Sequence, residues 1–394
     1  MKLSPFLAVL VLAACAHPQP VPPTPAAAPA TAEAAPPPVA AAPAAAAEPA
    51  EFLPVRGDGP PPLSLDRPLT RIALGSCSEE TAPIPILAAV AAFRPDLFLY
   101  VGDNVYGDAV SGDMKLPELR KAYADLSMNA HFSAFNMAFP ILATWDDHDY
   151  GLNDAGADFP AREVSERVFE TFWRDAALGG GRPGVYGART YGPPGYRVQV
   201  ILLDTRFFRS ALRRSETPNA SGYRPYLADR DPAKTMLGEA QWAWLADELK
   251  KPAEIRLVAS SIQVLADGHP FERWGTLPRE RDRLERTIAR SGARGVVLLS
   301  GDRHVGALYR RSTSVPYPLH ELTASSLNLA TPRASPEASV GQIGAVVTAA
   351  NFGAVEIDWP GRALTLSVRG MDGAPERRLA IPFARLGLPA RPSP

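Results

Sequence analysis

Short apolar runs alternate with segments of helical periodicity along most of the chain. The runs predict strands at residues 70–76, 96–103, 139–147, 197–206, 254–265 and 295–304. The segments between them predict helices at residues 83–93, 117–136, 161–175, 241–251 and 279–290. Beyond residue 306, the stretches ALYRR, HELTAS, GAVEID, ALTLSVRG and ERRLAIPF predict further strands. This order predicts an α/β fold with parallel strands and right-handed crossovers, to which the tail adds some antiparallel strands.

The beginning of the chain does not follow this pattern. MKLSPFLAVLVLAACAH joins one basic residue to a short apolar run that ends in Leu12-Ala13-Ala14-Cys15, which predicts a secretory signal over residues 1–15. The order Leu-Ala-Ala-Cys resembles a bacterial lipobox, so we expect a lipid on Cys15; an ordinary cleaved signal peptide is the alternative. Position 16 is Ala rather than Asp, which favours the periplasmic side of the outer membrane over the inner membrane.

Residues 16–62 are dominated by Ala and Pro over most of their length. Such a segment has too few large apolar side chains to form a core, and its prolines favour extended geometry. We therefore expect a disordered, semi-stiff tether between the lipid anchor and one folded domain at residues 63–388. The anchor would hold the protein outside the cytoplasm, attached to the bacterial envelope.

Composition and cysteine count narrow the function classes. The chain has 394 residues, of which 46% are hydrophobic and 21% charged, with a formal net charge of -1. This balance is typical of a globular protein and gives no electrostatic reason to expect nucleic-acid recognition. The chain has two cysteines. If Cys15 carries lipid, Cys77 has no partner for an intrachain disulfide, so we expect it to be buried or used chemically.

Polar side chains follow four of the predicted strands at the point where each strand ends. They lie in Gly75-Ser76-Cys77, in GDNVY (102–106), in DDHD (146–149) and in GDRH (301–304). Because ligands of α/β sheets bind at the carboxyl ends of the strands, we expect these clusters to converge. Taken singly, each residue has an ordinary interpretation: a buried thiol, a turn-forming Asp, a core Tyr or a hydrogen-bonded His. Together, so many carboxylates indicate bound cations, which would offset their charge.

The stretches LYVGDNVYGD, ATWDDHDYGLND, LLDTRFFR, SSIQVLADGHPFERW and LLSGDRH resemble the alkaline phosphatase D (PhoD-like) family of the calcineurin-like metallophosphoesterase superfamily. The resemblance covers about residues 71–310, with a compatible tail. It implies a four-layer α/β-β/α sandwich of two mixed sheets flanked by helices. It also implies Fe³⁺ and Ca²⁺ as cofactors, although the Asp-x-His that begins other members of the superfamily is absent here.

The resemblance assigns metal-binding roles to eight side chains. They are Cys77, Asp103, Tyr106, Asp146, Asp147, Asn153, Asp302 and His304. The thiolate and phenolate match iron ligands of the family, and Asp103 matches the aspartate that bridges the metals. Asn153 matches a carboxamide suited to Ca²⁺, which prefers oxygen ligands. Successive strand residues point to opposite sides, so we expect one of Asp146 and Asp147 to contact a metal and leave open which one.

Three further residues are candidates for catalysis. By analogy with the superfamily, His148 would protonate the leaving group or orient the phosphate; a supporting structural role is the alternative. Arg206 would clamp a phosphate oxygen, and the alternative is a structural pair with Asp204. The segment 267–274 is expected to form a loop over the mouth of the site, with His269 reaching substrate or metal; simple packing of the loop is the alternative.

These features predict metal-dependent hydrolysis of phosphate esters by a metal-activated hydroxide, as an alkaline phosphomonoesterase, a phosphodiesterase or both. The expected substrate is a small phosphate ester, a nucleotide or a phospholipid head group. One alternative is a catalytically inactive, metal-stabilised envelope binding protein of the same fold. Another is a redox protein that uses iron held by Cys77 and Tyr106, although hard oxygen ligands favour a Lewis acid over an electron carrier.

Overall fold

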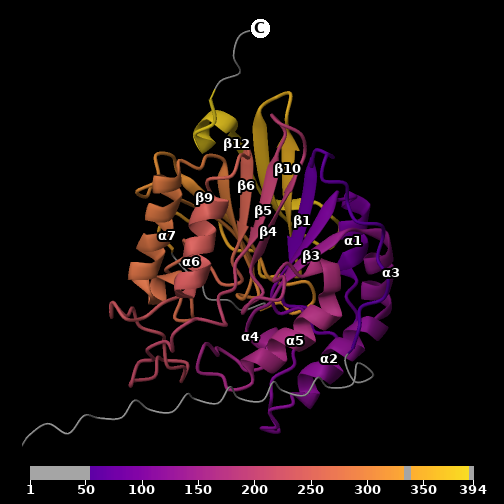
Figure 1. Cartoon of the computed structure of the whole chain (residues 1–394), viewed down its shortest axis with the longest axis vertical. Coiled ribbons are helices and arrows are strands. Elements are labelled where there is room, and N and C mark those ends of the chain that lie inside the picture. The colour runs from indigo at the N-terminus through magenta and orange to yellow at the C-terminus, as the bar shows by residue number, and fades with distance from the viewer. Residues whose placement is uncertain (1–53, 332–338, 390–394) are drawn as a thin grey trace, which may run out of the picture. The chain divides into compact units, whose positions relative to one another are not determined.

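The computed structural model describes residues 54–331 and 339–389. The predicted signal segment, the lipidation site Cys15 and most of the predicted tether lie outside these residues. Within the described part, the main strands form two six-stranded sheets (Figure 1). No helix among the described residues is both long enough and apolar enough to cross a bilayer.

The first sheet has the strand order β12-β11-β10-β1-β2-β3. Its strands are β1 (Arg71–Gly75), β2 (Leu97–Val101), β3 (Ile141–Thr144), β10 (Phe352–Asp358), β11 (Ala363–Arg369) and β12 (Pro375–Pro382). Strands β1, β2 and β3 are parallel, and the three C-terminal strands join them antiparallel. Crossover helices link the parallel strands: α1 (Ile86–Phe93) joins β1 to β2, while α2 (Pro117–Met128) and α3 (Ala130–Ala138) join β2 to β3.

The second sheet has the strand order β4-β5-β6-β7-β9-β8. Its strands are β4 (Gly187–Tyr191), β5 (Val198–Leu202), β6 (Ile255–Ala259), β7 (Val296–Ser300), β8 (Gly306–Arg311) and β9 (Leu319–Ala324). The central strands β5, β6, β7 and β9 are parallel, and β4 and β8 are antiparallel edge strands. Helices α6 (Gly238–Glu248) and α7 (Pro278–Ser291) are the crossovers of this sheet.

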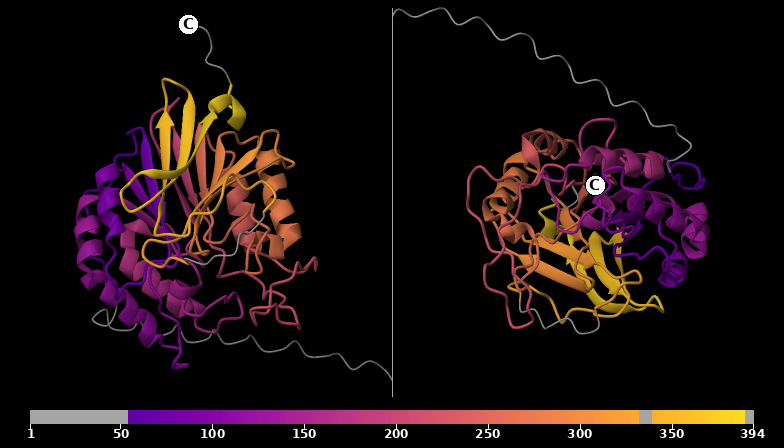
Figure 2. Two further views of the ribbon diagram at one scale, coloured as in Figure 1. Left: turned by 180° about the vertical axis from the view of Figure 1, so that it is seen from behind. Right: turned by 90° about the horizontal axis from the view of Figure 1, so that it is seen from below.

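The alternation of side chains in β2 shows how the layers form. Leu97, Leu99 and Val101 pack between the two sheets, against strands of the second sheet. Phe98 and Tyr100 face the other way and pack under α1, α2, α3 and α5 (Arg162–Trp173). Helices α6 and α7 cover the outer face of the second sheet in the same manner (Figure 2). The predicted four-layer sandwich of two mixed sheets flanked by helices is confirmed.

The structure refines several of the elements predicted from the sequence and the predicted start of the domain. The helical stretches predicted around 117–136 are two helices, and the boundary lies at Asn129, whose side chain accepts hydrogen bonds from the His131 and Phe132 N–H groups and begins α3. Strand β4 was not predicted. Arg56, inside the predicted tether, is buried and pairs with Asp175 at 3.1 Å. Ordered contacts with the domain therefore begin before residue 63.

Candidate metal centre

The four predicted polar clusters meet where the parallel strands end. Cys77, Asp103, Asp146 and Asp302 each lie two positions after the last residue of β1, β2, β3 and β7, respectively. The first three strands belong to one sheet and β7 to the other, so the cluster spans the junction between the sheets. This arrangement follows from the parallel strands, whose carboxyl ends share one edge of each sheet.

The backbone at these positions adopts unusual conformations. Cys77, Asp103, Asp302 and His304 all have positive φ angles, of 58°, 47°, 68° and 54°. Residues other than Gly adopt this left-handed region at a cost in energy, and such residues cluster at functional sites. Gly102 is also close to its neighbours: a Cβ there would lie 2.5 Å from the Cβ of Asp146. The chain therefore keeps strained, close-packed turns where the polar side chains converge.

A first donor group combines sulfur, oxygen and nitrogen. Cys77, Asp103 and His304 offer ligand atoms that all lie within 4.8 Å of one another. The Cys77 Sγ is 3.4 Å from Asp103 Oδ2, and the Tyr106 hydroxyl is 3.0 Å from His304 Nε2. Burial raises the pKa of the Cys77 thiol to about 11. A cation would reverse that effect, because a metal-bound thiol is deprotonated.

A second set of donors consists of carboxylates with His148. Asp147 shares one group with Asp103 and His148, another with Asp146 and Asp302, and a third with Asp154 and Glu272. In each group the ligand atoms lie within 4.8 Å of one another. Asp147 thus connects the carboxylate groups, and Asp103 connects them to the sulfur-containing group. Shared carboxylates are the arrangement that holds two cations close together.

The structure also distinguishes between Asp146 and Asp147. Oδ1 of Asp146 accepts hydrogen bonds from Arg206 Nε and Ser261 Oγ, both at 2.6 Å. Asp147 accepts the backbone N–H groups of His148 at 3.0 Å and Asp154 at 2.8 Å, and it lines a cavity of about 700 Å³. Asp147 is therefore the better-placed metal ligand, and Asp146 has one oxygen left for a cation.

The buried charge fits bound cations. Asp103 Oδ1, Asp146 Oδ2 and Asp302 Oδ2 are buried and have no hydrogen-bond partner among the described residues. Burial raises the pKa of Asp146 to about 8 despite the nearby Arg206 guanidinium. Burial, together with repulsion between neighbouring acidic groups, also raises the pKa of Asp103 and of Asp302 well above the ordinary range. The nearby guanidinium groups do not offset the negative charge of these carboxyls, and cations at the centre would do so.

His148 lies at the edge of this cluster and lines the cavity. Its Nδ1 is 2.5 Å from Asp108 Oδ2, and its ring centroid is 4.3 Å from that of Tyr106. Burial disfavours the charged ring, but Asp147 and Asp108 outweigh it and raise the pKa of His148 to about 9. Because Asp108 occupies Nδ1, Nε2 is the ring nitrogen left to act on a substrate.

Asn153 and Arg206 have hydrogen-bond partners that the sequence did not predict. Asn153 lines the cavity, and its amide donates to Asp154 Oδ2 at 2.8 Å. Arg206 is 0% exposed and is not among the described residues that line the cavity. Its side chain pairs with Asp146 and Glu272, which corrects the prediction of a phosphate clamp. The alternative, a structural pair with Asp204, is present through the backbone alone: Asp204 Oδ1 accepts the N–H of Arg206 at 2.8 Å, while the guanidinium pairs with Asp146 and Glu272.

The loop at 267–274 borders the cavity that the metal donors face. His269 is not one of the described residues that line this cavity. Gly268, Pro270, Phe271 and Glu272 line it, as the loop prediction requires. His269 is 4% exposed and packs with its ring centroid 6.1 Å from that of Phe271. Burial, with the charges of Arg303 and Arg273, lowers the pKa of His269 and keeps the ring neutral. The prediction that His269 reaches substrate or metal is therefore corrected.

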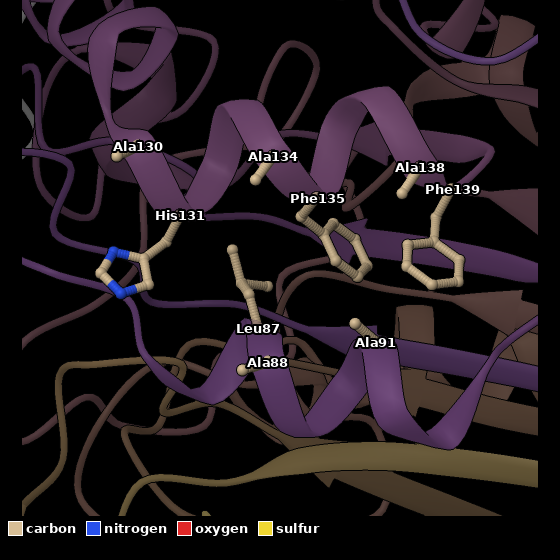
Figure 3. A pocket seen from close by; sticks show the side chains of 9 residues that line it. All are labelled: Leu87, Ala88, Ala91, Ala130, His131, Ala134, Phe135, Ala138 and Phe139. Carbon is tan, nitrogen blue, oxygen red and sulfur yellow. The ribbon is translucent and has the colours of Figure 1, made fainter.

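Other residues of the site were not predicted. Asp108, Asp154 and Glu272 lie within stretches that were singled out, but their roles depend on partners distant in sequence. They line or border a cavity of about 700 Å³ that also contains Asp103, Asp147 and His304. A second hollow, of about 390 Å³, lies between α1 and α3 and is lined almost wholly by Ala, Leu and Phe (Figure 3). Its composition suits packing rather than catalysis, so the first cavity is the candidate active site.

Comparisons with known proteins agree with this geometry. The sequence model of the family described as PhoD-like phosphatase matches residues 72–171 and 173–360. "Alkaline phosphatase D" of Bacillus subtilis (strain 168) is 25% identical over 276 residues, which are 60% of this chain and 46% of that protein. The chain thus spans about half the length of this curated relative.

Two solved structures share the fold. "Structure of PhoD" matches with a TM-score of 0.59 and 17% identity, over 82% of this chain and 70% of the other. Purple acid phosphatase PPD1 from yellow lupin (Lupinus luteus) seeds matches with a TM-score of 0.55 and 11% identity, over 82% of this chain and 55% of the other. At these identities the structural likeness shows the fold alone. The family match, which covers most of the chain, shows that this protein belongs to the PhoD-like phosphatase family.

Proposed function

We propose that this protein is a metal-dependent hydrolase of phosphate esters, acting as a phosphodiesterase, an alkaline phosphomonoesterase or both. The observation that carries the proposal is the sharing of Asp103 and Asp147 among adjacent donor groups that face a cavity also lined by His148. The family to which the chain belongs supports the same activity. Turnover of a monoester and of a diester by the same protein distinguishes the two activities.

The proposed cofactors are Fe³⁺ and Ca²⁺. Cys77, Tyr106, Asp103 and His304 offer the thiol, phenol, carboxylate and imidazole donors that suit iron. Asp147, Asp302 and Asn153 offer oxygen atoms, which Ca²⁺ prefers. Bound cations would offset the charge of the phosphate and lower the pKa of a bound water.

The protein's own residues would then divide the remaining work. His148, held by Asp108 through Nδ1, is positioned to give a proton to the departing alkoxide oxygen from Nε2. Arg206 holds Asp146 in place beside Asp147, so it acts as a positioning residue. The left-handed turns at Cys77, Asp103 and Asp302 hold their side chains toward one centre before substrate arrives.

The test is metal analysis of the purified protein with turnover of p-nitrophenyl phosphate and bis(p-nitrophenyl) phosphate. We expect iron and calcium in the wild type, hydrolysis of one or both esters, and loss of turnover in Asp103→Asn. The matched control is Asp66→Asn, an exposed carboxylate that belongs to none of the donor groups. Bound metal without turnover of either ester would contradict the proposal and favour an inactive binding protein of the same fold.

We further propose that the protein acts outside the cytoplasm, anchored through a lipid on Cys15 to the periplasmic side of the outer membrane. The support is the sequence MKLSPFLAVLVLAACAH and the Ala/Pro-rich stretch that follows it. Cys15 lies outside the described residues. Labelling with a radioactive fatty acid, in the wild type and in Cys15→Ser, tests the anchor; equal labelling of the two proteins would contradict it.

A further inference from the structure

The active-site cavity extends beyond the metal donors to a pair of aromatic rings. Tyr223 and Phe271 line the same cavity as Asp147 and His304, and their ring centroids lie 4.9 Å apart at an interplanar angle of 45°. Phe271 is 36% exposed. We propose that these two rings bind a flat aromatic group of the substrate, so that the preferred substrates are phosphate esters bearing a nucleobase or an aryl ring. This inference rests on the proposed phosphoesterase activity.

The aromatic pair is held in place by both of the loops that carry it. Tyr223 lies in the long connection between β5 and α6, and Phe271 lies in the connection between β6 and the short helix η3 (Trp274–Thr276). The Tyr226 N–H donates to the Pro270 carbonyl at 2.8 Å and joins the two connections. Asn219 Oδ1 accepts the N–H groups of Ser221 and Tyr223 and shapes the turn before Tyr223. Long loops with such internal order are commonly functional.

The two loops that carry Tyr223 and Phe271 form one wall of the cavity, and this wall also contacts the acidic donor groups. Arg214 Nη2 pairs with Asp154 Oδ2 at 2.6 Å, and Asp154 belongs to a donor group with Asp147 and Glu272. The guanidinium of Arg214 lies 4.2 Å from the ring centroid of Tyr226 and 5.7 Å from that of Tyr223. This chain of contacts fixes the rings relative to the carboxylates. When the phosphate of an ester binds at the metal donors, the organic part of the ester would therefore lie beside this wall.

One positive charge in the cavity lies directly beside the rings. The guanidinium of Arg303 lies 4.2 Å from the ring centroid of Phe271, and Arg303 itself lines the cavity between Asp302 and His304. Stacking of a base on an aromatic side chain tolerates any base, because every base has a π face. Removal of one such ring commonly weakens binding about tenfold. An alkyl or polyol group has no π face to stack on Tyr223 or Phe271.

The decisive comparison uses two ligands, one with and one without a nucleobase. Adenosine 5′-monophosphate and ribose 5-phosphate carry the same phosphate on the same sugar carbon. We would measure each as a competitive inhibitor of bis(p-nitrophenyl) phosphate or p-nitrophenyl phosphate hydrolysis by the full-length, metal-loaded protein. In the wild type we expect the inhibition constant to be at least about tenfold lower for the nucleotide. Equal constants would overturn the inference.

Substitutions locate the effect. Phe271→Ala and Tyr223→Ala should each raise the inhibition constant of the nucleotide about tenfold and leave that of ribose 5-phosphate within about twofold. Phe271→Trp, which keeps an aromatic ring at this position, should bind the nucleotide about as tightly as the wild type does. Tyr196→Ala is the matched control, since Tyr196 is a 39% exposed aromatic between β4 and β5. Equal weakening of both ligands would mean that Phe271 acts through Arg303 and would overturn the stacking role.

The outcomes separate this inference from the proposed activity. Absence of hydrolysis in the metal-loaded protein would contradict the phosphoesterase proposal but not the aromatic site. The two ligands would then be compared by calorimetry on the same protein. Tighter binding of the nucleotide that depends on Tyr223 and Phe271 would support the site, and equal binding would overturn it.

Discussion

Arg206 and Asp146 join the two sheets inside the acidic cluster. Arg206 follows β5 in the second sheet, Asp146 follows β3 in the first, and Nε donates to Oδ1 at 2.6 Å. Both side chains are fully buried, and the same guanidinium contacts Glu272. Coulomb attraction is strong in such surroundings, and the carboxylates keep Arg206 charged, since they raise its pKa although burial opposes them.

The first prediction concerns this contact. Arg206→Met should lower the free energy of unfolding by about 3–5 kcal/mol, because it leaves buried carboxylates without their partner. Lys250→Met is the matched control, since Lys250 pairs with Asp247 on the surface and should change stability by at most about 1 kcal/mol. Urea unfolding of the metal-free proteins measures both. Similar values for the two variants would contradict a structural role of the buried pair.

The order of strands and helices was predictable from the sequence because most strands are buried on both faces. Residues 254–265, EIRLVASSIQVL, are different: their apolar and β-branched residues predicted one strand over the whole stretch. Strand β6 ends at Ala259. The N–H groups of Val264 and Leu265 instead donate to the buried carboxylate of Glu321, at 2.8 and 2.6 Å. Apolar character cannot tell a strand from a buried loop whose backbone is satisfied by a distant side chain.

The candidate metal donors were predictable in part because several of them directly follow predicted strands and match motifs of the family that the sequence resembles. The surrounding residues were not, because their partners are set by the packing of the two sheets. Arg206 meets Asp146 across 60 positions and Glu272 across 66. A local motif does not reveal such a pair, so the sequence suggested a phosphate contact for Arg206 where the structure has an internal ion pair. Strand β4 was missed for a local reason: GARTY is an edge strand with little apolar character.

A second prediction tests the layer between the sheets. Leu99 in β2 is fully buried there, so Leu99→Ala should cost about 2–5 kcal/mol through the lost contacts and the cavity left behind. Leu65 is 55% exposed, and Leu65→Ala should change stability by no more than about 0.5 kcal/mol. Urea unfolding again gives both values. A loss below about 1 kcal/mol at Leu99 would be inconsistent with a tightly packed interface between the sheets.

A third prediction concerns pH. Burial, aided by repulsion from Glu170, Asp204 and Glu163, raises the pKa of Glu166 to about 7 from its ordinary value of 4.5, although the Gly184 N–H opposes the shift. A raised folded-state pKa stabilises the fold below pH 4.5, and this contribution is lost as pH rises through about 7. Between these values Glu166→Gln should therefore gain stability relative to the wild type.

Urea unfolding of the wild type and Glu166→Gln at several pH values between 4.5 and 8 gives this comparison. The glutamine keeps an oxygen that can accept the Gly184 N–H, which the Glu166 carboxylate accepts at 2.6 Å. The difference in free energy of unfolding should change steadily up to about pH 7 and then level off. A constant difference across the range would mean that Glu166 titrates alike in the folded and unfolded chain.

A fourth prediction concerns metal removal. Cations that bind only the folded chain stabilise it, by about 2.7 kcal/mol at a hundred times the dissociation constant. For a domain of this size, adding Ca²⁺ to chelator-treated protein should raise Tm by about 4 °C. Asp147→Asn should lose most of this rise, because Asp147 takes part in three of the donor groups. Asp66→Asn should retain it, and an equal rise in both variants would place the Ca²⁺ elsewhere.

The last prediction tests His148 as the proton donor. An alkoxide leaving group needs a proton as the ester bond breaks, whereas p-nitrophenolate leaves readily without one. His148→Gln should therefore reduce kcat about 10²–10⁴-fold for an alkyl phosphate and much less for p-nitrophenyl phosphate. His131→Gln is the matched control, because His131 lines the separate hollow between α1 and α3. Equal losses for the two esters would mean that His148 orients the phosphate instead, since that role does not depend on the leaving group.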